Sequence, residues 1–282
     1  MSTTRIALFG SHPLGEACLD CLDAHEDVRV ETIVTYSPEQ DNWWDGSLYE
    51  YARDRGHDVR TIDEADSVRE IEIDYLLSVY YPNILGPELL EHPEEGALNL
   101  HQAELPRYRG SNVFSHAIMN ARGDDHWRYG TTLHFMAEEV DAGDIVARKF
   151  VPITEDDTAR DLYLRTRLAS VELFAESLPD IVSGRVHDLR TPQSEFAGER
   201  YFYTKESLDG AKEIPADRLA SDDPAERRAV YDRIRALDFP PHEPAWTRLA
   251  GRKVYLTGSH HGIGEGTRNE TASLTAPAPG GR

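Results

Sequence analysis

The chain has 282 residues, and its 51 acidic and 30 basic side chains give a formal net charge of −21. This length is enough for one large domain and a smaller unit, and no run of about 18 apolar residues is present that would span a membrane. The acidic balance and the lack of a basic stripe argue against nucleic acid as a partner.

The basic side chains are almost all arginine, since the chain contains four lysines: Lys149, Lys205, Lys212 and Lys253. An acid-rich, lysine-poor composition is typical of halophilic proteins, which work in a high-salt cytoplasm. Such a surface repels itself in dilute buffer, whereas 1 M salt screens its charges within about 3 Å.

The first apolar run, at 6–9, is too short for a signal peptide. The only two cysteines, Cys18 and Cys21, lie in a helical pattern with neighbouring leucines. We therefore expect reduced thiols in the core rather than a disulfide or a zinc site, and a cytoplasmic location.

Strands alternate with helices over the first 80 residues. Apolar runs predict strands at 5–9, 28–36, 58–62 and 75–79, and amphipathic patterns predict helices up to residue 24, at 47–55 and at 65–70. This alternation predicts an α/β fold with a doubly wound, mostly parallel, Rossmann-like sheet.

The turn after the first strand contains Gly10 and Gly15 but lacks the G-x-G-x-x-G spacing of a dinucleotide site. An NAD site is therefore disfavoured, although a helix N-terminus at this position can meet a phosphate. The turn leaves open one alternative of another class, a non-catalytic Rossmann-type module that binds a nucleotide.

An amide, an imidazole and a carboxylate follow at Asn99, His101 and Asp141. Asn99 and His101 are two residues apart after an apolar pair, so on a strand they share one face. Each has an ordinary structural reading, as a turn residue or a core histidine. Together they suit attack of an amine on an acyl carbon, with Asn99 as donor to the oxyanion and His101 as acid or base.

The remainder of the chain predicts a strand at 145–152, and a long helix to 178–181 with Thr154 and Asp157 as its capping pair and Gly184 at its end. Short strands beginning at 201–205, a charged helix at 223–237 and a hairpin at 246–256 follow. We expect three parts: a catalytic domain at 1–185, a small β-rich subdomain at 186–257 and a disordered tail at 258–282.

Three separated segments follow one another along the chain: Asn-Leu-His at 99–101, Leu-Pro-Arg-Tyr-Arg-Gly at 105–110 and Val-Asp-Ala-Gly-Asp at 140–144. This arrangement resembles the 10-formyltetrahydrofolate-dependent formyltransferases, whose members act on methionyl-tRNA, glycinamide ribonucleotide or nucleotide sugars. The resemblance implies that Asn99, His101 and Asp141 are catalytic, with Asp141 orienting His101 and helping to deprotonate the acceptor amine. It implies no metal.

The resemblance also implies where 10-formyltetrahydrofolate would bind. One wall is the loop after the fourth strand, and the other is the segment before Asp141; the residues are Tyr81, Pro82, Asn83, Ile84 and Leu85, with Glu138, Glu139 and Val140 opposite. The structural alternative is that residues 84–87 only start a helix that packs on the sheet.

Segments 78–83, 99–112 and 201–205 look closer to the nucleotide-sugar N-formyltransferases than to the tRNA enzymes. The predicted acceptor is therefore the amine of a nucleotide-linked amino sugar, contacted by Arg107, Arg109, Gly110, Ser111, Tyr201 and Lys205. Methionyl-tRNA as acceptor and hydrolysis to formate remain the alternatives. Apolar residues at 239–241 and Trp246 offer surface for a possible homodimer.

Overall fold

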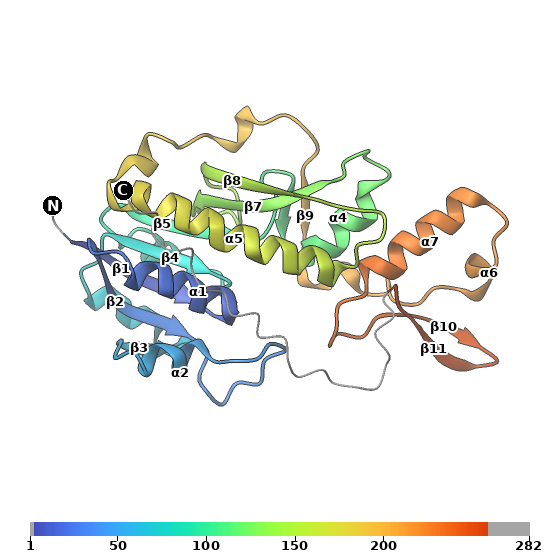
Figure 1. Cartoon of the computed structure of the whole chain (residues 1–282), viewed down its shortest axis with the longest axis horizontal. Helices are drawn as coiled ribbons and strands as arrows, with labels where there is room; N and C mark the ends of the chain where they lie inside the picture. Colours follow the sequence, from blue (N-terminus) through green and yellow to red (C-terminus); the bar gives the residue numbers. More distant parts are fainter. Residues whose placement is uncertain (1–2, 259–282) are drawn as a thin grey trace, which may run out of the picture.

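The central sheet of the computed structural model has seven strands in the order β3-β2-β1-β4-β5-β7-β8 (Figure 1). The structure describes residues 3–258. The strands of this sheet are β1 (Thr4–Gly10), β2 (Val28–Thr35), β3 (Val59–Thr61), β4 (Tyr75–Val79), β5 (Gly96–His101), β7 (Arg128–Phe135) and β8 (Ile145–Pro152).

The strands from β3 to β5 are all parallel, whereas β7 runs antiparallel to both β5 and β8. This arrangement confirms the doubly wound, mostly parallel sheet. The chain builds β2 and β3 on one side of β1 and then returns to place β4 and β5 on the other side. The strand order therefore reverses between β1 and β4, and the carboxyl edge at these strands is a topological switch point, beside which β5 lies.

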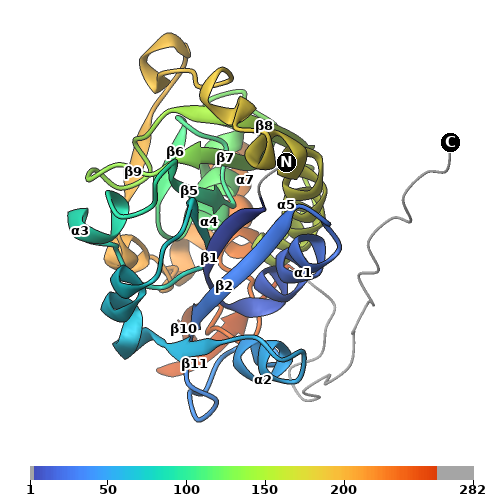
Figure 2. The same cartoon turned by 90° about the vertical axis from the view of Figure 1, so that its left-hand side faces the viewer.

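Helices cover both faces of the sheet (Figure 2). The longer α-helices are α1 (His12–Asp23), α4 (Val113–Ala121), α5 (Ala159–Val182) and α7 (Pro224–Ala236). The shorter ones are α2 (Leu48–Arg53), α3 (Pro87–Leu90) and α6 (Ala216–Leu219), with 3₁₀ turns η1 (Ile62–Glu70), η2 (Arg185–His187), η3 (Gln193–Glu195) and η4 (Lys205–Leu208).

Two apolar cores explain why the strands read as continuous hydrophobic runs. Leu8 and Leu77 pack with α1 and α5 on one face, while Phe9 and Leu76 pack with η1 and α3 on the other. Residues that alternate along one strand thus face two separate cores, as expected for a sheet covered on both sides. Cys18 and Cys21 are buried and unbonded on α1, as predicted.

The structure corrects the predicted start of the long helix. Asp157 does accept the Thr154 N–H at 2.7 Å, but both residues precede the helix. The N-cap is Thr158, whose hydroxyl accepts the Asp161 N–H while the Asp161 carboxylate accepts the Thr158 N–H. Both pairs fit a capping pattern by sequence, and the helical backbone decides between them. The predicted helix at 65–70 is part of the longer 3₁₀ turn η1.

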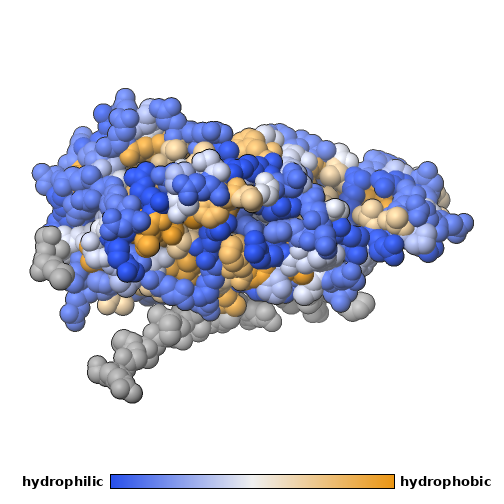
Figure 3. All heavy atoms as spheres, turned by 90° about the horizontal axis from the view of Figure 1, so that it is seen from above, coloured by the Kyte–Doolittle hydropathy of each residue, from blue (hydrophilic) through white to orange (hydrophobic). Residues whose placement is uncertain are grey.

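Beyond α5 the chain returns to the main sheet region before it forms the projecting end seen in Figures 1 and 3. Strand β9 (Tyr201–Tyr203) pairs in parallel with β6 (Tyr108–Gly110). Farther on, α7 and the hairpin β10 (Ala245–Leu249) and β11 (Arg252–Leu256) form a small core of their own. The predicted disordered tail lies outside the described residues except for Gly258.

Candidate active site

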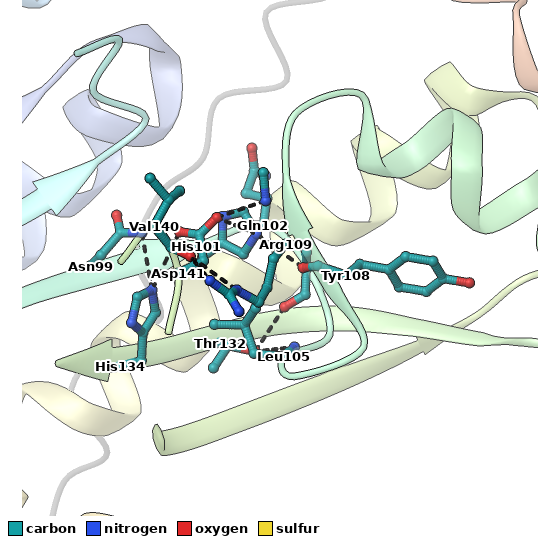
Figure 4. A network of polar contacts seen from close by, with 12 residues as sticks. Asn99, His101, Gln102, Leu105, Tyr108, Arg109, Thr132, His134, Val140 and Asp141 are labelled. Atoms are coloured by element: carbon teal, nitrogen blue, oxygen red, sulfur yellow. Dashed lines mark hydrogen bonds and ion pairs between the residues drawn. The ribbon is translucent and has the colours of Figure 1, made fainter. Parts of the chain in front are cut away.

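Strand pairing brings Asn99 opposite His134. In the antiparallel β5–β7 pair these two residues are direct partners, and the Asn99 Nδ2 atom lies 3.2 Å from His134 Nε2. Directly opposite side chains point to the same face of a sheet, so both reach the carboxyl edge of β5. Figure 4 shows the two side chains turned toward each other.

The hydrogen bonds of His134 show which of its ring nitrogens carries the hydrogen. Its Nδ1 lies 2.7 Å from the Phe135 carbonyl oxygen, which only accepts, so Nδ1 carries the hydrogen and Nε2 accepts an N–H from Asn99. Burial lowers the pKa of His134 to about 4, so the ring is neutral near neutral pH. This contact uses one N–H of the Asn99 amide and leaves the second for a ligand.

Asp141 lies beside the second histidine of the site. Its Oδ2 is 3.6 Å from His101 Nε2, and the same nitrogen is 3.3 Å from the Tyr108 carbonyl oxygen. Both neighbours are acceptors, so His101 Nε2 carries a hydrogen and the ring tautomer is set by its surroundings. The predicted residues Asn99, His101 and Asp141 therefore do come together.

The Asp141 carboxylate is held in its ionised form. Burial alone would raise its pKa, but the charge of His101, the Gly110 N–H at 2.9 Å and the Arg109 guanidinium outweigh burial and hold the pKa below its usual value. Arg109 also donates to the Val140 carbonyl through Nε at 2.9 Å. The site thus has a fixed negative group next to an imidazole.

Gly110 is required by the strand that packs against it. Its φ is +87°, and a Cβ there would lie 2.1 Å from the Tyr203 carbonyl oxygen of β9. Only glycine fits such a position without moving backbone. Because its N–H holds Asp141, the pairing of β6 with β9 also positions the carboxylate.

The predicted folate loop follows β4 directly. Tyr81, Asn83, Ile84 and Leu85 line a cavity of about 160 Å³ beside η1, while Pro82 is partly buried. Leu85 is buried, but the Ile84 side chain is 77% exposed. An exposed isoleucine next to a cavity fits a flat apolar ring better than it fits a packed helix start.

The predicted second wall, at 138–140, does not line this cavity and is more polar. Glu138 and Glu139 are exposed and Val140 is partly buried, and Arg109 ties this segment down through an ion pair with Glu139 at 2.8 Å. The two predicted walls belong to the connections after β4 and after β7.

The predicted acceptor residues divide into two groups. Arg109 and Gly110 contact the Asp141 segment, and Ser111 follows with its N–H donated to the Tyr203 carbonyl. The Arg107 guanidinium and the Tyr201 hydroxyl instead meet at Asp124, 2.5 and 2.9 Å away. Arg107 and Tyr201 are therefore occupied in a contact outside the Asn99–His101–Asp141 cluster.

Lys205 begins η4 with an exposed side chain, and its carbonyl accepts an N–H from Asn112 at 2.9 Å. Tyr108, in register with Tyr201, turns its ring away from Asn99, His101 and Asp141 (Figure 4). Phe202, which pairs with Arg109 and lies under its guanidinium, is 56% exposed. Phe202 and His134 are not among the site residues predicted from the sequence.

The site combines an amide donor, an imidazole and a buried carboxylate at the carboxyl edge of β5 in a Rossmann-like sheet. Among residues 3–258, no group of three or more histidine, cysteine or acidic side chains could hold a metal ion. Within the same range, no helix is long and apolar enough to cross a membrane. These features define an α/β protein with a site suited to acyl transfer.

The family comparison agrees with this class. The formyl transferase family matches residues 24–178, more than half of the chain. The chain therefore belongs to the formyl transferase family.

One curated relative is the methionyl-tRNA formyltransferase of Listeria monocytogenes, 29% identical over 191 residues, which are 68% of this chain and 55% of that protein. The match thus spans about half of the relative's length. Two solved structures share the fold over a larger part of the chain.

The first is a 4-N formyltransferase from Francisella tularensis, with a TM-score of 0.70 and 20% identity over 90% of this chain and 96% of that one. The second is the N-formyltransferase from Helicobacter canadensis in complex with folinic acid and dTDP-3-aminofucose. Its TM-score is 0.66, with 21% identity over 91% of this chain and 87% of that one.

Proposed function

We propose that this protein transfers a formyl group from 10-formyltetrahydrofolate to the amine of a nucleotide-linked amino sugar. The observation that carries the proposal is the cluster of Asn99, His101 and Asp141 in a chain of the formyl transferase family. The acceptor nitrogen bonds to the formyl carbon, the bond from that carbon to N10 breaks, and the proton lost by the amine ends on N10.

The folate supplies the formyl carbon, and the protein supplies three groups around it. Asn99 donates its second amide N–H to the oxygen that gains negative charge, as an oxyanion hole does. His101 moves the proton between the amine and N10. Asp141 stays ionised, orients the imidazole and stabilises its charged form.

Two features fit the folate. The loop residues Tyr81, Asn83, Ile84 and Leu85 border a cavity, and exposed Ile84 offers an apolar cover. Glu138, Glu139 and Val140 form the second wall in this proposal. Arg109 and Ser111 are the proposed acceptor contacts nearest to Asp141, with Lys205 farther along the chain; Arg107 and Tyr201 would act only if they left Asp124.

The amino-sugar acceptor is supported by charge and by the structural relatives. A protein with a net charge of −21 and four lysines is poorly suited to bind a tRNA, because tRNA binding needs many contacts to phosphates. Binding of a sugar diphosphate needs only one or two cationic side chains. The Helicobacter relative is described with dTDP-3-aminofucose bound. Methionyl-tRNA is the second candidate acceptor, favoured by the 29% identical Listeria relative.

A competition assay separates the acceptors. The purified protein, in high salt with 10-formyltetrahydrofolate, is offered dTDP- and UDP-linked amino sugars or charged initiator tRNA. The masses of the products are then measured by mass spectrometry. We expect a folate-dependent mass gain of one formyl group on a sugar nucleotide and none on tRNA. Formylation of tRNA alone would reverse the acceptor assignment; formate release without acceptor would indicate a hydrolase.

We also propose that the protein works in a salt-rich cytoplasm and that residues 1–185 form its catalytic unit, with 186–257 attached to it. Its lysine-poor, acidic composition and the free, buried thiols of Cys18 and Cys21 support this salt-rich cytoplasmic location.

A homodimer is a further proposal. Phe239 packs on Trp43 and Tyr163 of its own chain, so exposed Leu249 and Tyr255 of the hairpin are better candidates for that surface.

A further inference from the structure

We propose that Gln193 is a positioning residue: its carboxamide holds the backbone of the loop that carries Asp141 and so sets the carboxylate against His101. The catalytic part of this inference rests on the proposed function. Gln193 lies on η3, outside the segment at 24–178 that matches the family, and nothing in the motif pattern selects it.

The contact is specific. The Gln193 Nε2 atom donates to two carbonyl oxygens, those of Asp141 and Gly143, each at 2.8 Å. The Gln193 side chain is buried, with 7% of the residue exposed. Both N–H bonds of one amide group thus satisfy two backbone acceptors of the same loop.

The loop needs an external support. Asp141 has a φ of +53°, a left-handed conformation that is unfavourable for a residue with a Cβ. At Gly143 a Cβ would lie 1.9 Å from the Phe135 carbonyl oxygen, so the loop passes very close to β7. A residue in such a conformation persists only where its surroundings hold it.

Gln193 and β6 hold the loop from separate parts of the chain. Arg109 donates to the Val140 carbonyl, and the Gly110 N–H donates to Asp141 Oδ2. Gln193 contributes the contacts to the Asp141 and Gly143 carbonyls. Arg109 is also a candidate substrate contact, whereas both hydrogen bonds that the Gln193 amide donates within residues 3–258 go to backbone of the loop, so its effect can be separated from substrate binding.

Gln193 is itself well anchored. Thr191 and Ile145 exchange two backbone hydrogen bonds of 2.9 Å, which attach the segment before η3 to the start of β8. The Arg200 guanidinium donates to the Gln193 carbonyl at 2.6 Å. The amide is therefore fixed relative to the sheet, as a positioning role requires.

Loss of this support should act on Asp141. The charged or titratable groups that face its carboxylate are His101 from β5, His134 from β7 and Arg109 from β6. His101 and Arg109, together with the Gly110 N–H, keep the Asp141 pKa low against the effect of burial. A loop that drifts from them loses that stabilisation, so the Asp141 pKa should rise.

The first test is kinetic. Gln193→Met removes both N–H donors but keeps a side chain of similar length. Gln193→Glu removes the same donors and keeps the shape of the side chain. We expect kcat to fall about 10- to 100-fold in each, as for a misplacement of about 1 Å, with KM for both substrates within about twofold. Ser194→Ala, an exposed neighbour on η3, is the matched control and should match the wild type.

A double-mutant cycle separates positioning from a general structural effect. If Gln193 acts through Asp141, Gln193→Met in an Asp141→Asn background should cost little further kcat. An equal loss in both backgrounds overturns the inference, as does wild-type kcat in both Gln193 variants. If one variant does not fold, the other gives the result.

The second test needs no activity. A carbon-13 NMR titration of the Asp141 carboxyl should show a higher pKa in Gln193→Met than in the wild type, and no change in Ser194→Ala. If the wild-type protein formylates no acceptor, the proposed function fails, while this titration still decides the role of Gln193. An unchanged Asp141 pKa overturns the inference.

Discussion

Asn99 is the residue whose contribution is easiest to isolate, because its amide has one N–H on neutral His134 and the other free for a ligand. Removing a single oxyanion donor costs about 10²–10³ in rate. We therefore predict that Asn99→Ala lowers kcat by that factor with a smaller change in KM, as measured by steady-state formyl transfer.

The control for Asn99 is Asn42→Ala, which truncates a partly buried asparagine of the loop before α2 and should leave kcat unchanged. Circular dichroism checks that both variants are folded. Activity of Asn99→Ala within threefold of the wild type would assign the oxyanion contact to another group. It would also favour a binding module over an enzyme if no variant at Asn99, His101 or Asp141 changed turnover.

Asn99, His101 and Asp141 could be predicted as catalytic candidates because three segments in order resemble those of the formyltransferases. Asn99 and His101 are two residues apart on a strand, so their side chains lie on one face of the sheet. Asp141 belongs to a turn sequence that follows the next strand. His134 and Gln193 could not be found in this way. The role of His134 depends on the register of β5 against β7, and that of Gln193 on where a distant 3₁₀ turn packs.

The split of the acceptor candidates has a similar cause. Arg107 and Arg109 are two residues apart, but only Arg109 reaches the Asp141 loop, because Arg107 lies before β6 and pairs with Asp124. Likewise Tyr201 pairs with Tyr108 while Phe202 pairs with Arg109. Sequence similarity identified the segments, and the backbone decided which side chains face the site.

At the scale of elements, α5 is a suitable place to test a cap. Thr158 accepts the Asp161 N–H and Asp161 accepts the Thr158 N–H, so the pair satisfies groups that the helix itself leaves open. We predict that Thr158→Ala lowers the free energy of unfolding by about 1 kcal/mol, measured by urea denaturation.

Thr158→Ser keeps the hydroxyl and is the matched variant; it should lose clearly less stability than Thr158→Ala. Equal losses would show that the Thr158 methyl group contributes more to stability than the cap does. This methyl group lies close to Gly258, where an added Cβ would contact it. Catalytic rates per folded molecule should stay the same, since the Thr158 hydroxyl bonds to Asp161 of its own helix.

Long, apolar strands were predictable because burial on both faces leaves a continuous hydrophobic run, as in 75–79. The three-residue strand β6 was not predicted and β9 only as part of a longer segment, because three residues carry too little pattern. Their pairing comes from tertiary contact. The Thr154–Asp157 and Thr158–Asp161 pairs fit the same motif, so only the helix itself could distinguish them.

The whole molecule is dominated by charge. Its formal net charge is −21, and hydrophilic side chains cover most of the face in Figure 3. Repulsion among surface carboxylates opposes the compact state, and salt screens it. We predict that the melting temperature rises as KCl is increased from dilute buffer to molar concentration, as followed by scanning fluorimetry.

Sucrose is the control for this series, because it stabilises folded proteins by exclusion from the surface without screening charge. A larger rise in KCl than in sucrose supports screening. A melting temperature that stays flat or falls across the KCl series would remove the basis for a high-salt setting.

The pairing of β6 with β9 has a consequence for how the protein is made. Gly110 emerges from the ribosome more than 90 residues before Tyr203, yet these two residues are partners in the finished structure. The strands of the central sheet and α5, which completes the core on one face, are all synthesised before Gln193 and β9. A nascent chain that ends before residue 193 therefore lacks two of the supports of the Asp141 loop.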